Sequence, residues 1–331
     1  MKIGIVVITY NEERFIGMCL DSVLTAIQGF DATLVVVDSL STDKTCLIAE
    51  QRNVPVHRIP DTALRCAALG RWIGAQKIGH CDYILFLDGD MTLHSQFLEN
   101  AIAELENEPK AAGIVGINEY LYYKNDTIVK RRENYLGITD RRKAKHFGGA
   151  LLVKKPVYDL VGGYDPCIFA EEETEFYSRI EGYGYCVLQI PELMVTHHTD
   201  WVPGFRKLLN LINPLNRRNY GVGQGFVRSI AKGNVRQYLQ RQYDVLVNLI
   251  ADLVSVSVCL TSGFSVSALR FLITVQVAEL LFNYFAKGSF KWFVINKARY
   301  LHLLYGIAYY MTFQRVACKE TLLSHDESYR T

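Results

Sequence analysis

Short apolar runs alternate with segments of helical spacing over the first hundred residues of the 331-residue chain. The runs Ile3–Ile8, Thr33–Val37 and Tyr83–Leu87 are continuous rather than alternating, which is typical of strands buried on both faces of a parallel sheet. Residues 14–25 instead repeat apolar side chains every three to four positions, as an amphipathic helix does. This order predicts an α/β fold: a doubly wound, mostly parallel sheet with helices on both faces.

The pattern dissolves between Glu119 and Phe147, where the sequence is polar and basic. A stretch of this length without periodicity predicts an irregular loop. Its basic side chains fit either a mobile lid that pairs with substrate phosphates or a solvated loop, and we favour the solvated loop. The candidates for phosphate contacts are Arg131, Arg132 and Arg141. A further short strand is expected at Val187–Ile190.

The composition changes near residue 201, which divides the chain into three expected parts. Residues 1–200 would form the α/β domain. Residues 201–243 would form a basic helical connector, because they contain eight Lys or Arg and no acid. Residues 244–331 would form an apolar helical region, in which stretches 245–264 and 268–286 are each about long enough to cross a bilayer.

Three arrangements of the apolar region stay open. A membrane-spanning hairpin is favoured by basic residues on both flanks and an uncharged turn, a pattern that places both ends in the cytoplasm. Helices lying in the membrane interface are favoured because polar residues fall near one helical face, namely Gln276, Glu279, Asn283 and Lys287. A soluble dimer interface is the third, so a homo-oligomer is among the alternatives. We expect membrane contact, at the cytoplasmic face of the cell membrane.

Charge and cysteine content exclude some classes of protein. The net charge of +2, without a long basic tract, gives no case for nucleic-acid binding. The eight cysteines contain no CxxC pair, which argues against a zinc site. The apolar run at residues 3–8 is too short for a signal peptide.

Two carboxylates, Asp88 and Asp90, follow the third apolar run with only Gly89 between them. The carboxyl end of such a strand opens into the crevice where α/β sheets bind ligands. Mg²⁺ or Mn²⁺ takes one or two carboxylates together with substrate phosphate oxygens. An ordinary turn is the alternative, since Asp and Gly are common there. The chain has no glycine-rich phosphate loop, which favours the metal.

The first two runs also end in polar residues. Thr9, Tyr10 and Glu12 follow the first run, and Asp38 ends the second. An acid after the second strand is where a doubly wound sheet meets a ribose or a base. The alternative for Asp38 is a helix cap, although Ser41 is also available for that purpose.

An acidic run, Glu171–Glu173 with Glu175, lies further along the chain. Crowded carboxylates raise the pKa of at least some members, which suits a general base. The alternative is an acid-rich first turn of a helix, stabilised by the helix dipole. Beyond it, His197 follows a short strand, and a neutral imidazole is a plausible third metal ligand beside the two aspartates.

Together these motifs resemble the family 2 glycosyltransferases, which are nucleotide-diphospho-sugar enzymes of GT-A fold, usually inverting. Each motif is weak alone, but seven occur in the family's order over roughly residues 1–200. The matching segments are Ile8–Glu13, Val37–Thr45, Arg71 with Gly74, Leu87–Asp90, Gly162–Asp165, Glu172–Glu175 with Arg179, and Val195–His197.

The resemblance implies a role for each matching residue. Nucleotide-sugar contacts would come from Thr9, Tyr10, Glu12, Asp38, Arg71, Asp88 and Gly89. Metal ligands would be Asp90, Asp88 and His197, and the general base would be Glu173, with its neighbour Glu172 kept as the alternative. The chain departs from the family pattern at Ser39, where many members have a second acid, at Trp72, where Asn is usual, and at Glu173, where Asp is usual.

The expected function is therefore a metal-dependent inverting glycosyltransferase that uses Mn²⁺ or Mg²⁺. The resemblance implies a nucleotide-diphosphate sugar as donor, most commonly a uridine diphosphate sugar. It also implies a hydroxyl acceptor, expected to be lipid-linked, in cell-envelope polysaccharide or glycolipid synthesis. The alternatives are a polyprenyl-phosphate glycosyltransferase, a non-catalytic nucleotide-sugar-binding protein, and a sugar nucleotidyltransferase. The last normally needs a glycine-rich N-terminal loop, which this chain lacks.

Overall fold

The structure, a computed structural model, describes residues 1–61, 64–203, 206, 209–211, 213, 215–287 and 289–314. It divides into two compact units, residues 1–203 and 204–331. The end of the apolar region expected at 244–331 lies outside the described residues beyond position 314.

The first unit alternates strands and helices, as the sequence predicts. Its strands are β1 Lys2–Thr9, β2 Asp31–Asp38, β3 Val56–Arg58, β4 Tyr83–Asp88, β5 Met91–Leu93, β6 Ala111–Lys124, β7 Thr127–Arg132, β8 Arg142–Lys143, β9 Ala150–Lys154 and β10 Cys186–Asp200. Its helices are α1 Ile16–Ala26, α2 Thr45–Glu50, α3 Ala67–Lys77, α4 Phe97–Glu106, α5 Lys155–Leu160 and α6 Glu172–Gly182.

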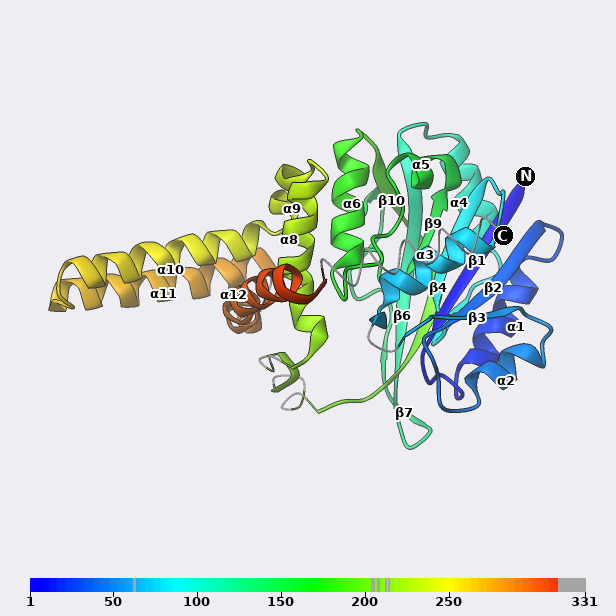
Figure 1. Ribbon diagram of the computed structural model, residues 1–331, viewed down its shortest axis with the longest axis horizontal. Helices are drawn as coiled ribbons and strands as arrows, with labels where there is room; N and C mark the ends of the chain where they lie inside the picture. The colour runs from blue at the N-terminus through cyan, green and yellow to red at the C-terminus, as the bar shows by residue number, and fades with distance from the viewer. Residues whose placement is uncertain are drawn as a thin grey trace. The chain divides into compact units, whose positions relative to one another are not determined.

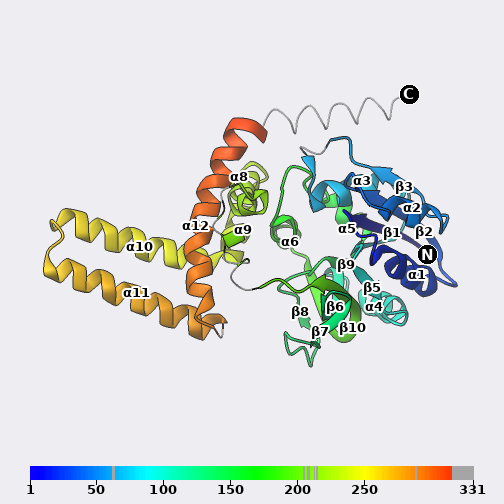
Figure 2. The ribbon, with the colours of Figure 1, turned by 90° about the horizontal axis from the view of Figure 1, so that it is seen from below.

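These strands form one ten-stranded sheet with the order β3-β2-β1-β4-β9-β6-β10-β5, in which β7 pairs with β6 and β8 with β10 (Figure 1). Strands β3, β2, β1 and β4 are parallel. The remainder is mixed, because β9, β5, β7 and β8 pair antiparallel with their neighbours. Helix α3 covers one face of the sheet, and α1 and α4 cover the other (Figure 2). The α/β class is thus confirmed, with a sheet that is parallel mainly in its first half.

Helix α3 packs unusually close to β1. A Cβ placed on Gly74 would lie 2.1 Å from a methyl group of Val6, so only glycine allows this approach. Gly70, one turn earlier, faces Ile8 in the same way. The helix therefore lies directly on the strand that leads into the candidate site.

The expectation of an irregular loop at residues 119–147 is wrong for its first part. Strand β6 continues to Lys124 and pairs in parallel with β10, while β7 returns beside it. All six residues of β7 are exposed, so backbone pairing rather than side-chain burial holds this hairpin and no apolar pattern reveals it. The expected strand Val187–Ile190 is likewise part of the longer β10, which continues past Pro191 through a shift in register.

Two of the three candidate phosphate-binding arginines, Arg131 and Arg141, are already paired with acids. Arg131 contacts Glu119 and Glu133, and Arg141 contacts Glu104 and Glu108. These ion pairs fit the solvated interpretation rather than a lid held ready for phosphates.

The second unit is helical. Its elements are the 3₁₀ turn Arg217–Tyr220, α8 Gly221–Ala231, α9 Val235–Arg241, α10 Tyr243–Thr261, α11 Val266–Lys287, α12 Lys291–Tyr309 and a π-helical turn Tyr310–Gln314. Helices α10 and α11 run side by side as a hairpin (Figure 2). Both are long and apolar enough, by length and composition alone, to cross a membrane.

Polar side chains of the hairpin pair with one another and with α12. Lys297 contacts both Asp252 and Glu279, and Gln276 donates to Asp252 at 2.7 Å. One turn away, Asn283 and Asn296 continue a chain of amide hydrogen bonds that ends at Asn248. In the interfacial arrangement, the polar face of α11 would meet lipid headgroups. Within this unit that face is covered instead, since Glu279 and Asn283 are buried.

The buried pair Glu175–Arg179 in α6 yields a test of this packing. The Arg179 guanidinium binds both carboxylate oxygens at 2.7 and 2.8 Å, and both side chains are inaccessible to solvent. Arg179→Met should lower the free energy of unfolding by about 3–5 kcal/mol, because the carboxylate stays buried without this cation.

The control is Lys155→Met, which breaks the exposed pair Lys155–Asp159 at the same helical spacing. It should cost about 0.3–0.5 kcal/mol. Urea unfolding measures both values, and equal losses would contradict the assignment.

Candidate active site

Three parallel strands, β1, β2 and β4, end side by side, which brings the predicted donor residues together. Thr9 at the end of β1 pairs in register with Asp38 of β2, and the preceding Ile8 pairs with Asp88 of β4. Gly89 then crosses against β1, and a Cβ there would lie 3.0 Å from Thr9 Oγ1. Segments eighty residues apart in sequence therefore meet at one edge of the sheet.

Arg71 of α3 lies at the centre of the candidate site. Its side chain is buried, with 2% of its surface exposed. It donates to Asp88 Oδ1 at 2.8 Å and to Glu172 Oε1 at 2.7 Å, and lies 3.9 Å from Glu173 Oε1. One guanidinium thus joins three carboxylates from two distant segments.

Glu172 and Glu173 are the first residues of α6, and Glu173 also contacts the backbone just before β9. Its carboxylate accepts hydrogen bonds from the backbone N–H groups of Gly148 and Gly149, at 3.3 and 3.0 Å. Gly149 has φ +84°, and a Cβ there would lie 2.4 Å from Asp88 Oδ2, so glycine is required. Burial raises the pKa of both glutamates, although Arg71 opposes the rise.

Asp90 and His197 form a second polar pair in the candidate site. The His197 Nε2 atom lies 2.8 Å from Asp90 Oδ2, in a register set by the pairing of β5 with β10. Burial lowers the pKa of His197, but the adjacent Asp90 carboxylate outweighs it and the net pKa is raised. His197 Nδ1 is buried with no hydrogen-bond partner among the described residues. His198 is held by Tyr123 instead, at 2.8 Å.

The site has an excess of negative charge. Burial, with repulsion from Asp90 and Asp88, raises the pKa of Glu12 to about 8. Burial and Asp90 raise the pKa of Asp88 to about 6, against the attraction of Arg71. The carboxylates around Asp90 therefore outnumber their cationic partners, Arg71 and His197.

The expected set of three metal ligands is not assembled. Across the described parts of the chain, no three His, Cys, Asp or Glu side chains converge on one point. Asp88 faces Arg71, which leaves Asp90 and His197 as the adjacent pair. Two protein ligands still fit Mg²⁺ or Mn²⁺ when a substrate diphosphate supplies further oxygens, and the excess negative charge favours a cation there.

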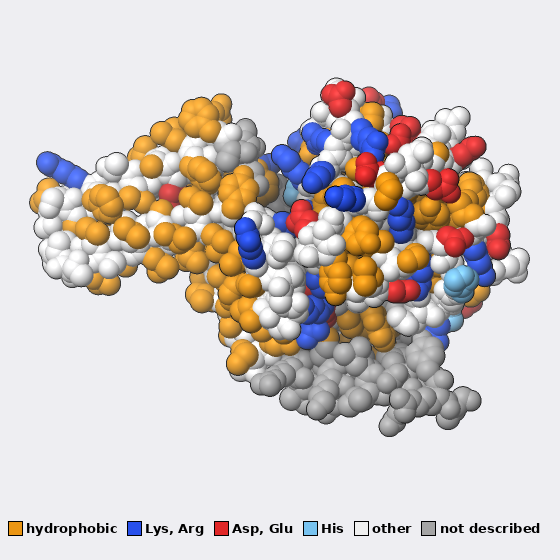
Figure 3. Space-filling view, turned by 90° about the horizontal axis from the view of Figure 1, so that it is seen from above, with side chains coloured by type: hydrophobic (Ala, Val, Ile, Leu, Met, Phe, Trp, Pro, Cys, Tyr) orange, Lys and Arg blue, Asp and Glu red, His pale blue; other side chains and the backbone are white. Residues whose placement is uncertain are grey.

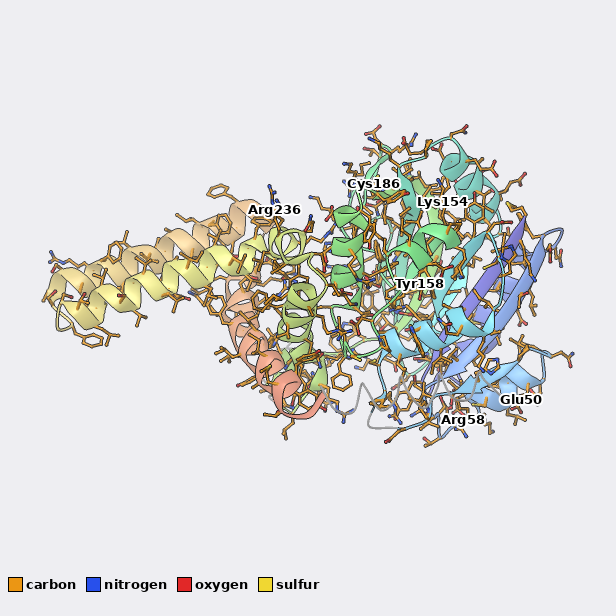
Figure 4. All side chains as sticks on the ribbon, turned by 45° about the horizontal axis from the view of Figure 1, so that its top comes forward. Glu50, Arg58, Lys154, Tyr158, Cys186 and Arg236 are labelled. Carbon is orange, nitrogen blue, oxygen red and sulfur yellow. The ribbon has the colours of Figure 1, made fainter. Side chains whose placement is uncertain are left out.

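The predicted nucleotide residues lie beside the loops after β1 and β2. Asp38 is fully buried, and its carboxylate accepts from the Ser41 backbone and hydroxyl and from Arg58, which ends β3 (Figure 4). Asp38 does not cap α2, which begins at Thr45 after Lys44, so the capping alternative is wrong. Its carboxylate instead closes a local turn with Ser41. Tyr10 is 41% exposed and its ring stacks under the Arg65 guanidinium at 3.8 Å.

Several residues at this site were missed from the sequence. Arg58 and Arg65 gave no signal, because each is a single basic residue without a motif. The Gly148–Gly149 pair was a signal for close backbone approach, and its contact with Glu173 explains it. Tyr120, whose ring lies 5.2 Å from that of His197, fell in the segment taken for a loop.

Residues 4–164 match the family model described as Glycosyl transferase family 2. This part of the chain is a family 2 glycosyltransferase domain. Among solved structures it is similar to the mannosyltransferase PcManGT from Pyrobaculum calidifontis in complex with GDP-Man and Mn²⁺, with TM-score 0.58, 17% identity, and 92% of this chain and 86% of that chain covered. It is also similar to S. aureus TarS residues 1–349 in complex with UDP-GlcNAc, with TM-score 0.54, 14% identity, and 95% and 93% covered.

At these identities the likeness establishes the fold, which is of GT-A type. No curated protein sequence matches the chain. The match over residues 4–164 confirms the expectation of a glycosyltransferase enzyme. The roles of individual residues stay predictions.

The raised pKa of Glu12 predicts a pH-dependent stability. Folded Glu12 holds a proton that the unfolded chain releases near pH 4.5, so without a cation stability should fall as the pH rises from about 4.5 to 8. In Glu12→Gln this fall should be smaller. Adding Mn²⁺ to the wild-type protein at pH 8 should restore the stability that is lost without a cation. Melting temperatures at pH 5, 6.5 and 8, in EDTA or Mn²⁺, measure both effects.

Glu50→Gln is the matched control, since Glu50 is exposed in α2 (Figure 4). It should keep the wild-type pH profile. A Glu12→Gln profile equal to that of the wild type would show that Glu12 is not the group responsible.

Proposed function

We propose that this glycosyltransferase moves a sugar from a nucleotide-diphosphate donor to a hydroxyl acceptor, with inversion at the anomeric carbon. The convergence of Asp88, the Asp90–His197 pair and Glu173 at one edge of the sheet is the observation that supports it most. The PcManGT and TarS structures contain GDP-Man and UDP-GlcNAc, and this supports a nucleotide-sugar donor here. A uridine diphosphate sugar is our first choice.

The donor would lie over the ends of β1 and β4. Tyr10 offers an exposed aromatic face for the base. Thr9 Oγ1 is buried and lacks a hydrogen-bond partner within the described residues, so it is free to bind a donor oxygen. Asp38 would support this pocket through the Ser41 turn rather than by direct contact.

Asp90 and His197 would hold Mn²⁺ or Mg²⁺ together with the donor diphosphate. The Mn²⁺ in the PcManGT structure supports this choice of ion. When bound, the ion neutralises charge on the departing diphosphate. Asp88, kept in place by Arg71, would orient the donor sugar or ribose.

Glu173 is the better candidate for the general base. Glu172 is committed to Arg71 at 2.7 Å and its side chain is 12% exposed, whereas that of Glu173 is 26% exposed. Its raised pKa suits proton removal from a hydroxyl. The acceptor oxygen attacks the anomeric carbon while its proton passes to Glu173, and the bond to the nucleotide diphosphate breaks on the opposite face.

This arrangement favours a hydroxyl acceptor over the alternatives. A polyprenyl phosphate is already ionised and needs no base, so Glu173 would have no role. A binding protein without catalysis would not need a carboxylate with a raised pKa beside the donor residues.

Glu173→Gln should lower transfer by at least about a hundredfold while leaving donor affinity within about twofold, because only proton removal is lost. Glu172→Gln is the matched control and should reduce transfer less. A screen of UDP- and GDP-sugars with Mn²⁺ or Mg²⁺, followed by nucleotide release and donor titration, measures both. A larger loss in Glu172→Gln would make Glu172 the base.

We also propose that the α10–α11 hairpin inserts into the cell membrane from its cytoplasmic face. The acceptor would then be lipid-linked, and the enzyme would serve envelope polysaccharide or glycolipid synthesis. Only 28% and 17% of the most apolar windows of α10 and α11 are buried. Their exposed side chains are largely aliphatic or aromatic (Figure 3). The charged residues Asp252, Glu279 and Lys297 pair internally, which lowers the cost of placing them in lipid.

Replacing Leu253 and Ile273 together with Glu should therefore abolish membrane binding, since both side chains are more than 60% exposed on the hairpin. Each acid at the core of a bilayer costs about 2.5–3.5 kcal/mol. Flotation with phosphatidylglycerol-containing vesicles measures the bound fraction, and Leu160→Glu on α5 is the matched control. A wild-type protein that does not float, but forms a dimer that the double variant breaks, would establish the soluble interface instead.

A further inference from the structure

Helix α12 of the second unit has an exposed apolar stripe. Its members extend from the residue before the helix to the turn after it, and they recur at intervals of three, four or seven positions. Such spacing places side chains along one side of a helix. Each member is at least 40% exposed; they are Phe290, Val294, Leu301, Leu304 and Met311. A contiguous apolar surface of this kind marks a site of interaction with a protein or a membrane.

The opposite side of α12 packs tightly on α8. A Cβ on Gly306 would lie 2.0 Å from the carbonyl oxygen of Tyr220, and a Cβ on Gly223 of α8 would lie 2.2 Å from that of Leu303. Gly306 follows Leu304 by two positions, which is about 200° around a helix axis. Helix α8 therefore covers the side of α12 that faces away from the apolar stripe.

The α10–α11 hairpin meets α12 on the side of the stripe. Lys297 lies three positions after Val294 and four before Leu301, so it belongs to the same side of the helix. It pairs with Asp252 of α10 and Glu279 of α11. Helix α12 runs across the base of the hairpin (Figure 2). A hairpin inserted into a bilayer would therefore bring α12 to the membrane surface with its stripe toward the lipid.

The charges of this region favour an anionic lipid surface. Helix α12 contains three basic residues, Lys291, Lys297 and Arg299, and no acid. The segment 202–243, which precedes the hairpin, contains eight basic residues and no acid. Anionic headgroups attract basic segments of this kind. Two copies of α12 packed along the stripe would instead bring like charges together, whereas paired helices usually place opposite charges beside their apolar seam.

Resting on the hairpin insertion proposed above, we infer that α12 is a second membrane-binding element. It lies along the surface of an anionic bilayer, with its apolar stripe at the boundary between headgroups and acyl chains. An interfacial helix buries its apolar face about 5–10 Å into that boundary. The hairpin enters the bilayer and α12 rests on it, so the two together fix the depth and orientation of the second unit.

A tryptophan placed in the stripe measures its depth. The test uses the full chain carrying Leu304→Trp, bound to vesicles of phosphatidylcholine and phosphatidylglycerol in which one lipid is brominated near the headgroup or near the chain end. Bromine near the headgroup should quench the added fluorescence at least about twofold more strongly than bromine near the chain end. The wild type, with three native tryptophans, supplies the background. Leu47→Trp, at an exposed leucine of α2, is the control and should not be quenched.

Charged variants of the stripe measure its contribution to binding. Leu301→Glu with Leu304→Glu should lower the partition coefficient onto these vesicles about tenfold or more, because two leucines lose their contact with acyl chains. Leu47→Glu with Leu160→Glu is the matched control, with two exposed leucines in the first unit and the same change in charge. It should stay within about twofold of the wild type. Equal losses in the two double variants overturn the inference, and the depth measurement decides if the stripe variant fails to fold.

The two levels of the proposal fail differently. A wild-type protein that does not bind the vesicles overturns the insertion of the hairpin and this inference with it. Binding without quenching of Leu304→Trp, or with stronger quenching from the chain end, overturns the interfacial helix and leaves the hairpin standing. A wild-type dimer in solution that Leu301→Glu with Leu304→Glu dissociates would show that a second copy covers the stripe, which also overturns the inference. Nucleotide release measures the proposed transfer reaction separately from all of these.

Discussion

The candidate site depends on a single buried cation, Arg71. It binds Asp88 at 2.8 Å and Glu172 at 2.7 Å, and lies close to Glu173, so it links the end of β4 to the start of α6. Its position follows from backbone packing, because Gly74 and Gly70 let α3 lie directly on β1. A larger residue at position 74 would push the helix away and move the guanidinium out of reach of the carboxylates. The electrostatics of the site therefore rest on two glycines that take no part in chemistry.

Arg71 and His197 do not balance the carboxylates around them. The folded protein raises the pKa values of four carboxyl groups, those of Glu12, Asp88, Glu172 and Glu173. Their ionised forms are therefore less stable in the folded protein than in water. A donor diphosphate would add further negative charge and would be repelled by the site as it stands. A divalent cation held by Asp90 and His197, as proposed above, would offset both charges, and cation and donor binding would then be coupled.

The sequence predicts the parts of this protein that rest on local pattern. Strands β1, β2 and β4 are continuous apolar runs, and the polar residues that follow them meet because adjacent parallel strands end together. The β6–β7 hairpin could not be predicted, since every side chain of β7 is exposed and its sequence therefore carries no burial pattern. The pairing of Asp38 with Arg58 also depends on a tertiary contact between residues of no distinctive motif. The contact of Asp88 with Arg71 has the same origin, because it joins residues seventeen positions apart through the packing of α3 on β1.

The α10–α11 hairpin is the part of the second unit that constrains where the enzyme works. The α10–α11 hairpin has its polar side chains paired inside and aliphatic side chains outside, the reverse of what a solvated helical pair needs. If the hairpin inserts into a membrane, as proposed above, the enzyme would work beside a bilayer, and a lipid-linked acceptor would be held in the same place.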